Sequence, residues 1–156
     1  MKCKIAIIVL LLAATSVNAR TTDDFGIGII AGEPTGLSLK YWLDEDYAID
    51  GAVAWSYSEN DSLQLHGDYL IHDYDLLEDD EFPVYYGIGA RLKLKDDDGR
   101  GSNKKHAMFG IRVPLGITYL FEDEPIDLFF EVVPVLDLSP DVELDINAAV
   151  GLRFYF

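Results

Sequence analysis

Residues 142–156, VELDINAAVGLRFYF, decide the fold because their side chains alternate between two kinds. The even-numbered residues, from Val142 to Phe156, are all apolar, whereas the odd-numbered ones include Glu143, Asp145 and Arg153. A period of two is that of a β-strand. A strand of about 15 residues is long for a globular domain, where about 5–6 is usual. One apolar face opposite a charged face is typical of a membrane barrel, with lipid outside and a packed polar lumen inside.

The same period recurs along the rest of the chain. Turn-forming and acidic residues separate eight alternating segments, and we predict a strand at each. Their approximate ranges are 24–31, 35–43, 47–57, 62–74, 82–95, 106–121, 126–138 and 142–156. Short connections make them an antiparallel meander. Because an open edge in lipid would leave backbone groups unpaired, the meander must close. The sequence therefore predicts an all-β fold, an eight-stranded up-and-down transmembrane β-barrel.

Two prolines fall inside predicted strands. Pro114 interrupts the sixth segment and Pro134 the seventh. Proline has no N–H group to donate to a neighbouring strand. We therefore expect a bulge or a locally missing hydrogen bond at each proline.

The first nineteen residues have the features of a secretory signal peptide. Lys2 and Lys4 precede ten apolar residues at 5–14, and the small residue Ala19 precedes the expected cleavage. Ten apolar residues are fewer than the ~20 of a spanning helix. We predict a signal peptide at 1–19 and a barrel domain at 20–156. The only cysteine, Cys3, lies in the removed segment, so the mature chain would have no disulfide or cysteine metal site.

The charge of the chain narrows the classes of partner. The formal net charge is −16, and removal of Lys2 and Lys4 leaves 10 basic against 28 acidic residues, or −18. Such an excess of acid repels nucleic acid, so we expect no nucleic-acid partner. Hydrophobic residues make up 49% of the chain, which is too many for a disordered acidic protein.

The alternation does not by itself say which face points outward. In a soluble barrel of the lipocalin kind, the charged face would be in water and the apolar face inside. Two features favour the membrane arrangement. Glycines such as Gly26 and Gly28 share the charged face, which suits a narrow lumen, and aromatics such as Trp55, Phe109 and Phe121 lie near the margins of the apolar face.

Two motifs resemble known families. The chain ends with Gly151, Phe154 and Phe156 at the spacing of a barrel-assembly signal, with Ala149 where a polar residue is usual. In this the chain resembles the small eight-stranded outer-membrane barrels of the OmpA and OmpX type. The stretch GEPTGLS at 32–38, together with Tyr41 and Trp42, resembles an uncharacterised family of small predicted outer-membrane barrels. The resemblance implies a bacterial outer-membrane location, contact with outer-membrane lipid, insertion by the barrel-assembly machinery and no known activity.

The resemblance also implies that both chain ends face the periplasm. The turns at 44–46, 78–81 and 122–124 would then be periplasmic, and they carry ten acidic residues and no basic one. The longest connection, residues 96–105, would lie on the cell surface. It is the place where we expect any surface partner to bind.

The inward positions of the barrel hold charges of both signs. Eight strands enclose a lumen just wide enough for side chains to fill, and buried charges there need partners. We predict an ion-pair network, centred on Arg112, Glu131 and Arg153, that fills the lumen. Its expected members are Lys40, Asp50, Asp68, Arg91, Arg112, Glu131, Asp145 and Arg153. The expected function is a structural or interaction role, and the alternative is a narrow, porin-like channel for ions or small solutes.

Catalysis and metal binding have weaker support. His66, Asp68 and His72 share one strand face that Ser62 begins, so an acid–base pair is conceivable in a lipid-modifying enzyme. No nucleophile motif accompanies them, and the acidic run at 96–99 lacks the later ligands of a calcium loop. We therefore expect no enzyme activity, no metal and no cofactor. A soluble barrel that binds an apolar ligand is the remaining alternative.

Overall fold

The computed structural model describes residues 24–56, 62–96 and 105–156. The predicted signal peptide at 1–19 lies outside these residues, as does most of the predicted surface loop at 96–105. No helix within the described ranges is long and apolar enough to cross a membrane.

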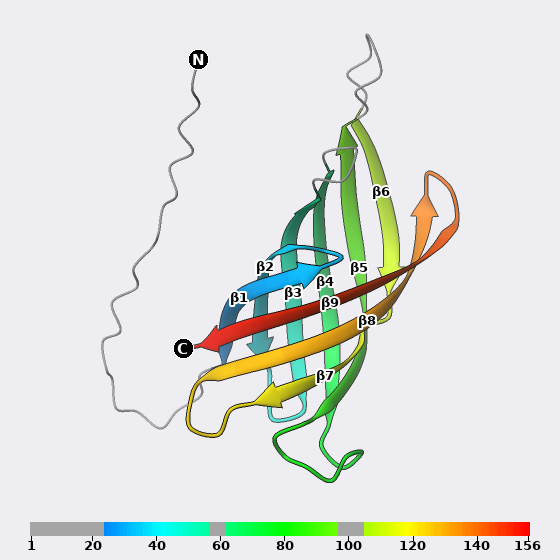
Figure 1. Ribbon diagram of the computed structural model, residues 1–156. Helices are drawn as coiled ribbons and strands as arrows, with labels where there is room; N and C mark the ends of the chain where they lie inside the picture. The colour runs from blue at the N-terminus through cyan, green and yellow to red at the C-terminus, as the bar shows by residue number, and fades with distance from the viewer. Residues whose placement is uncertain (1–23, 57–61, 97–104) are drawn as a thin grey trace, which may run out of the picture.

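The described residues form a closed antiparallel ring of strands (Figure 1). Strands β1 to β5 pair in chain order, β6 and β7 each pair with β5 and β8, β8 pairs with β9, and β1 pairs with β9 to close the ring. The strands are β1 (Phe25–Gly32), β2 (Gly36–Trp42), β3 (Tyr47–Ser56), β4 (Ser62–Asp73), β5 (Val84–Asp96), β6 (Lys105–Arg112), β7 (Leu115–Leu120), β8 (Ile126–Ser139) and β9 (Glu143–Tyr155).

The ring has eight positions although nine strands are described, because β6 and β7 are two halves of the predicted sixth strand. Both halves pair with β5 and with β8, and the register is the same on the two sides of Pro114. Gly87 N donates to Pro114 O (3.0 Å), and Val113 N donates to Pro134 O (3.0 Å). Neither proline can return a bond, so a hydrogen bond is missing at each, as predicted. A register shift lies elsewhere, between Phe109 and Gly110.

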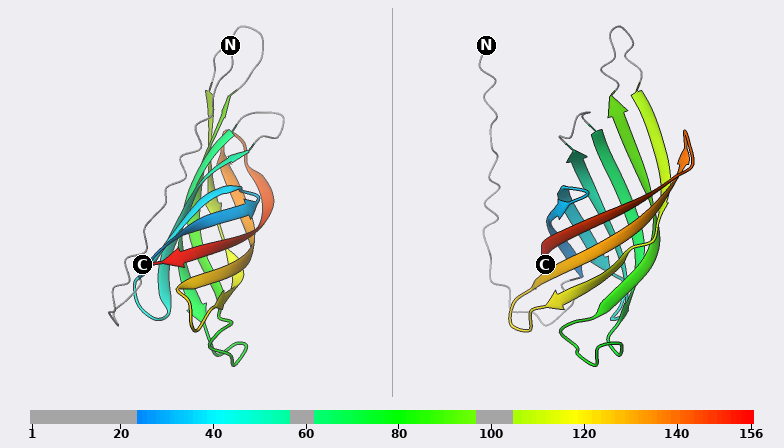
Figure 2. Two further views of the ribbon diagram at one scale, coloured as in Figure 1. Left: turned by 60° about the vertical axis from the view of Figure 1, so that its left-hand side comes forward. Right: turned by 45° about the vertical axis from the view of Figure 1, so that its right-hand side comes forward.

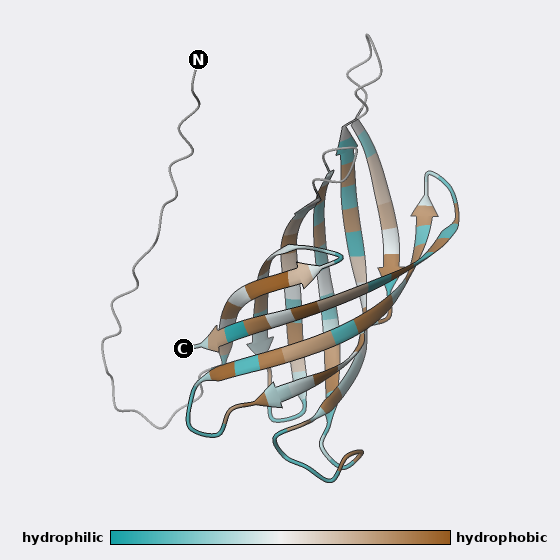
Figure 3. Cartoon of the chain, viewed as in Figure 1, coloured by the Kyte–Doolittle hydropathy of each residue, from teal (hydrophilic) through white to brown (hydrophobic). Residues whose placement is uncertain are grey.

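The charged face of the strands lies inside the ring. On β9, Arg153 is 1% exposed, whereas the outward Leu152 and Phe154 are each 43% exposed. Figure 3 shows the same change of hydropathy from one residue to the next along β8 and β9. A soluble, lipocalin-like barrel would have an apolar interior and a charged exterior. The interior here is charged, so this part of the soluble alternative is wrong.

The two ends of the barrel differ. The end that carries the β2–β3, β4–β5 and β7–β8 turns, at the bottom of Figure 1, holds the ten acidic turn residues and is called the acidic end here. The opposite end is called the loop end. The β1–β2 hairpin stops short of it, as both views in Figure 2 show. Pairing of β1 with β9 stops at Gly32–Ala149, so residues 143–148 of β9 pair with β8 alone among the described strands.

Candidate functional site in the barrel lumen

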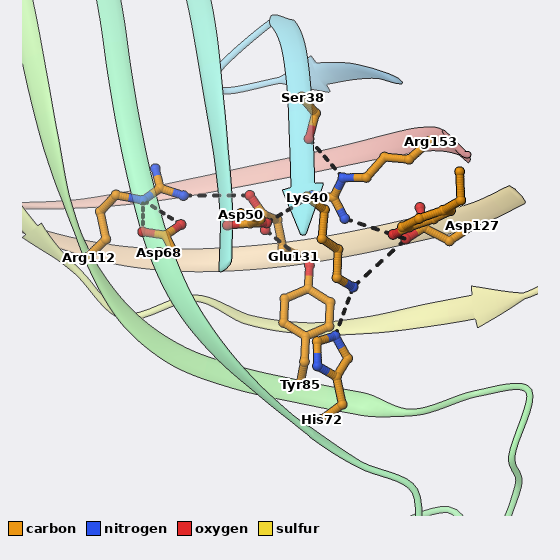
Figure 4. Close-up of polar contacts among 11 residues, drawn as sticks. Ser38, Lys40, Asp50, Asp68, His72, Tyr85, Arg112, Asp127, Glu131 and Arg153 are labelled. Carbon is orange, nitrogen blue, oxygen red and sulfur yellow. Dashed lines mark hydrogen bonds and ion pairs between the residues drawn. The ribbon is translucent and has the colours of Figure 1, made fainter. Parts of the chain in front are cut away.

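Arg153 links four strands across the lumen (Figure 4). From β9, its Nη2 donates to Asp50 Oδ2 on β3 (2.9 Å) and its Nε donates to Ser38 Oγ on β2 (2.9 Å). Its Nη1 lies 3.6 Å from Asp127 Oδ2 on β8. The guanidinium carbon also lies 3.9 Å from the centre of the Phe129 ring. Arg153 therefore holds opposite walls of the barrel together.

Asp127 joins Arg153 to the aromatic groups nearer the acidic end. Its carboxylate accepts a hydrogen bond from the Tyr155 hydroxyl and lies 3.9 Å from Lys40 Nζ. Lys40 Nζ also forms a 2.9 Å hydrogen bond with His72 Nε2 and lies 4.0 Å from the Trp42 ring centre. A cation over an aromatic face is stabilised by the charge distribution of the ring. The buried ammonium thus has an anion, a histidine and an aromatic face as neighbours.

Arg112 forms a second group, nearer the middle of the barrel. Its Nε donates to both oxygens of Asp68 (3.0 and 3.1 Å), and its Nη2 lies 3.7 Å from Glu131 Oε1. The Tyr85 hydroxyl donates to Glu131 Oε2 (3.0 Å). Arg112 is fully buried, and so is Tyr85. We call the residues of these two groups the central network: Ser38, Lys40, Asp50, Asp68, His72, Tyr85, Arg112, Asp127, Glu131, Arg153 and Tyr155.

Glycines make room for the long side chains of this network. A Cβ atom at Gly89 would collide with the carboxylate of Asp68, and one at Gly116 would collide with the Tyr85 ring. At Gly151, part of the predicted assembly signal, it would collide with the Phe129 ring. Small inward residues and large ones therefore alternate around the lumen, which is how a narrow barrel is filled.

A third group lies closer to the loop end. Arg91 on β5 donates to Asp137 on β8 through Nε (3.0 Å) and Nη2, and Nη2 also lies 3.2 Å from Asp145 Oδ2. The amide of Asn147, in the orientation that satisfies both of its ends, donates to Asp145 and accepts from Arg91, each at 3.1 Å. Asp145 Oδ1 accepts from the backbone N–H of Ile146 (2.9 Å). That contact covers part of the β9 edge that no strand pairs with.

The structure brings together most of the residues predicted for the lumen network. Asp145 is partly exposed and the other seven are buried. Arg112 contacts Glu131, whereas Arg153 contacts Asp50 and Asp127 instead of Glu131. Five residues that were not among the eight predicted members also form contacts in the lumen: Asp127, Asp137, His72, Tyr85 and Tyr155. All five lie on inward positions of the same alternation, so the signal was present in the sequence.

The residues considered for catalysis have other partners. The carboxylate of Asp68 is bound by Arg112, and His72 bonds to Lys40. His66 Nδ1 is buried without a hydrogen-bond partner among the described residues, so the acid–base pair of His66 and Asp68 is not formed. Within residues 24–56, 62–96 and 105–156, no three His, Cys, Asp or Glu side chains are grouped to hold a metal.

The C-terminal aromatic residues of the predicted assembly signal lie on the outer surface. The rings of Phe154 and Phe156 are 5.3 Å apart and meet edge to face, and Phe156 also lies 6.3 Å from Phe25 on the paired strand β1. Their contacts hold the ends of the first and last strands together.

Comparisons with known proteins agree with this architecture. The family described as "Protein of unknown function (DUF3996)" matches residues 16–155. The N-terminal β-barrel domain of Pseudomonas aeruginosa OprF is similar, with a TM-score of 0.67 and 14% identity over 85% of this chain and 95% of that one. Neisserial surface protein A (NspA) gives a TM-score of 0.52 and 16% identity over 85% and 93%. A search of curated proteins finds no match.

Both solved structures are small outer-membrane β-barrels, so the predicted resemblance in fold is confirmed. The family match confirms the predicted relation to an uncharacterised family. At these identities, the two structures bear on the fold and not on the role of any lumen residue.

Proposed function

We propose that this chain, which belongs to the DUF3996 family, is an integral β-barrel of a bacterial outer membrane whose lumen is closed by ion-paired side chains. One observation carries the proposal. The interior holds buried Arg112 and Arg153, while the exterior is an almost unbroken apolar surface. Such a surface is unusual for a protein in water, because contiguous exposed apolar patches on soluble proteins rarely exceed a few hundred Å². Lipid around a polar lumen fits it.

Aromatic residues on the outside support a membrane boundary near the acidic end. Three ring pairs lie there, with centre distances of 4.7, 6.0 and 6.3 Å. They are Phe82–Tyr119, Tyr47–Tyr69 and Phe25–Phe156. Tyrosine and related rings gather where hydrocarbon meets water. In this proposal the acidic end faces the periplasm, and its charges keep the turns out of the hydrocarbon.

The proposed role is structural or interactive. Lys40, Arg112 and Arg153 cross the lumen, and Tyr85 and Phe129 fill the space between them, so a solute would have to break buried ion pairs to pass. A surface partner would bind at residues 96–105. Export would use the signal peptide at 1–19, and insertion would use Gly151, Phe154 and Phe156. We propose no enzyme activity and no cofactor.

A narrow, porin-like channel for ions or small solutes is the second candidate. A cavity of about 230 Å³ enters the lumen near the loop end and is lined in part by Arg91 and Lys93. In this alternative, a solute that entered the cavity would still have to pass the central network.

The two tryptophans of the chain give a direct test of the membrane arrangement. Trp55 lies on the outer face of β3, and Trp42 points into the lumen, 4.3 Å from the His72 ring. Each can be studied alone, in Trp42→Phe and Trp55→Phe variants refolded into vesicles that contain brominated lipid. We expect bromine to quench strongly the fluorescence of Trp55, in the Trp42→Phe variant, and only weakly that of Trp42, in the Trp55→Phe variant. Equal quenching of the two, or none, would contradict the proposal.

A further inference from the structure

A cavity near the loop end of the lumen is not filled by the central network. It has a volume of about 230 Å³ and lies beside the β1–β2 turn, where the short hairpin leaves β9 without a partner on that side. Its walls come from the turn and from β3, β4, β5 and β9. Because a water molecule needs only about 10–15 Å³ of such space, the cavity is large enough for a small organic molecule.

Four charged side chains line this cavity, and two of them are already paired. Arg91 and Asp145 contact each other, and Arg91 also binds Asp137. The other two, Lys93 and Glu33, make no side-chain hydrogen bond or ion pair within the described part of the chain. One is a cation and the other an anion. The cavity thus holds one unpaired charge of each sign.

A buried amide adds a donor beside the cation. Gln64 lines the cavity, is only 6% exposed, and its Nε2 has no hydrogen-bond partner in the described residues. Gln64 on β4 stands directly opposite Lys93 on β5. Directly opposed side chains on one face of a sheet have Cβ atoms about 4.5–5.5 Å apart. An ammonium and an unused N–H donor therefore lie together on one wall.

The anion comes from a different wall of the cavity. Glu33 belongs to the β1–β2 turn, and β3 separates that hairpin from β4 in the ring. Glu33 and Asp145 both attract the Lys93 ammonium without forming an ion pair with it. The space between the two unpaired charges is the cavity itself.

We propose that this cavity binds a small zwitterion, with its carboxylate or phosphate against Lys93 and Gln64 and its ammonium against Glu33. Lys93 is partly buried, so an unpaired charge there is costly, whereas Glu33 is exposed and offers its carboxylate to the cation of a ligand. A ligand with a single charge would leave one of the two residues uncompensated. A zwitterion satisfies both and adds no net charge. An amino acid in solution and the phosphoethanolamine headgroup of a lipid share this chemistry.

The test is titration calorimetry on the full chain refolded in detergent. L-Alanine carries both poles, whereas propionate carries only the anion and ethylamine only the cation. We expect saturable one-to-one binding of L-alanine and binding about tenfold or more weaker for each single-charge probe, since a charge-assisted hydrogen bond contributes roughly 1.5–3 kcal/mol. Glycerophosphoethanolamine identifies the source: tighter binding than L-alanine supports the lipid headgroup, and weaker binding supports a free solute.

Variants locate the binding in the cavity. Lys93→Met and Glu33→Gln should each weaken L-alanine binding about tenfold or more. Lys95→Met removes a lysine of the same strand that lies outside the cavity lining, and it should leave binding unchanged. Glu33 is in an exposed turn, so its variant remains informative if Lys93→Met misfolds.

Two results would overturn the inference. One is the absence of saturable binding of either zwitterion to protein with the spectrum of a folded barrel. The other is equal affinity of the wild type, Lys93→Met and Glu33→Gln. Neither result affects the membrane arrangement, which the tryptophan quenching tests separately.

Discussion

The centre of the lumen and its loop end are built from the same kinds of residue and differ in how well they are filled. In the centre, every strand has partners on both sides, and Arg153 reaches anions or hydroxyls on three other strands. At the loop end, β9 has no strand partner on one side, Arg91 contacts anions on β8 and β9 among the described residues, and a cavity remains. The lumen is thus tightly packed where every strand of the ring is paired on both sides, and it is less well filled beyond the end of the short β1–β2 hairpin.

The largest effect should come from Arg153→Met, which removes contacts with side chains on three other strands. Asp50 would be left buried without its hydrogen-bonded cation, and Asp127 would lose one of its two. Removing one partner of a buried ion pair costs about 3–5 kcal/mol. Urea unfolding in lipid vesicles should show a loss of this size. The outward variant Leu152→Met serves as the matched control, and equal stability of the two variants would contradict the comparison.

Arg91→Met should destabilise the barrel less, by about 1–3 kcal/mol, because the groups left behind have more access to water. Asp145 is partly exposed and lines the cavity, although Asp137 is buried. The same unfolding measurement gives the order of the two variants. A loss as large as that of Arg153→Met would mean that the two regions are equally packed.

The seam between the first and last strands can be weakened without any change of charge. A Cβ atom at Gly28 would collide with the backbone of Leu152 and Arg153, so Gly28→Ala should cost about 1–3 kcal/mol. Gly67 is the control, because a Cβ there meets only Asp50 O at an ordinary contact distance. Gly67→Ala should be close to neutral. Similar stabilities for the two variants would show that the β1–β9 seam is not tightly packed.

The smallest effect concerns the acidic end, outside the lumen. Burial, with the negative charges of Asp46, Glu45 and Asp80, raises the pKa of Tyr74 to about 12. Its hydroxyl donates to Glu45 O (3.1 Å). The pKa of a tyrosine in the unfolded chain is about 10, so between about pH 10 and 12 the unfolded state loses the Tyr74 proton while the folded state keeps it. The free energy of unfolding should therefore fall as the pH rises through this range. Tyr74→Phe should lack this fall, and an identical pH profile would contradict the assignment.

The sequence was sufficient to predict the faces of the strands but not the pairs of residues across the lumen. Alternation is a local property, so it placed Arg112, Glu131 and Arg153 inward correctly. Which inward groups meet depends on the strand register and on the stagger of the closed ring. That is why the contacts of Lys40 with His72 and Asp127 were not predicted.

The cavity could not be predicted for a related reason. It results from the difference in length between the β1–β2 hairpin and β9, and the consequence of that difference appears only when the ring closes. The prolines show the opposite case. The missing N–H group at Pro114 and Pro134 is a property of the residue itself, so its effect on strand pairing was predictable from the sequence.

The conductance of the refolded protein in a planar lipid bilayer tests the central claim most directly, with quenching of Trp55 as the measure of insertion. A lumen closed by the central network should give no channel steps from inserted protein. Discrete and reproducible single-channel steps from the wild type would contradict closure and would favour the narrow channel.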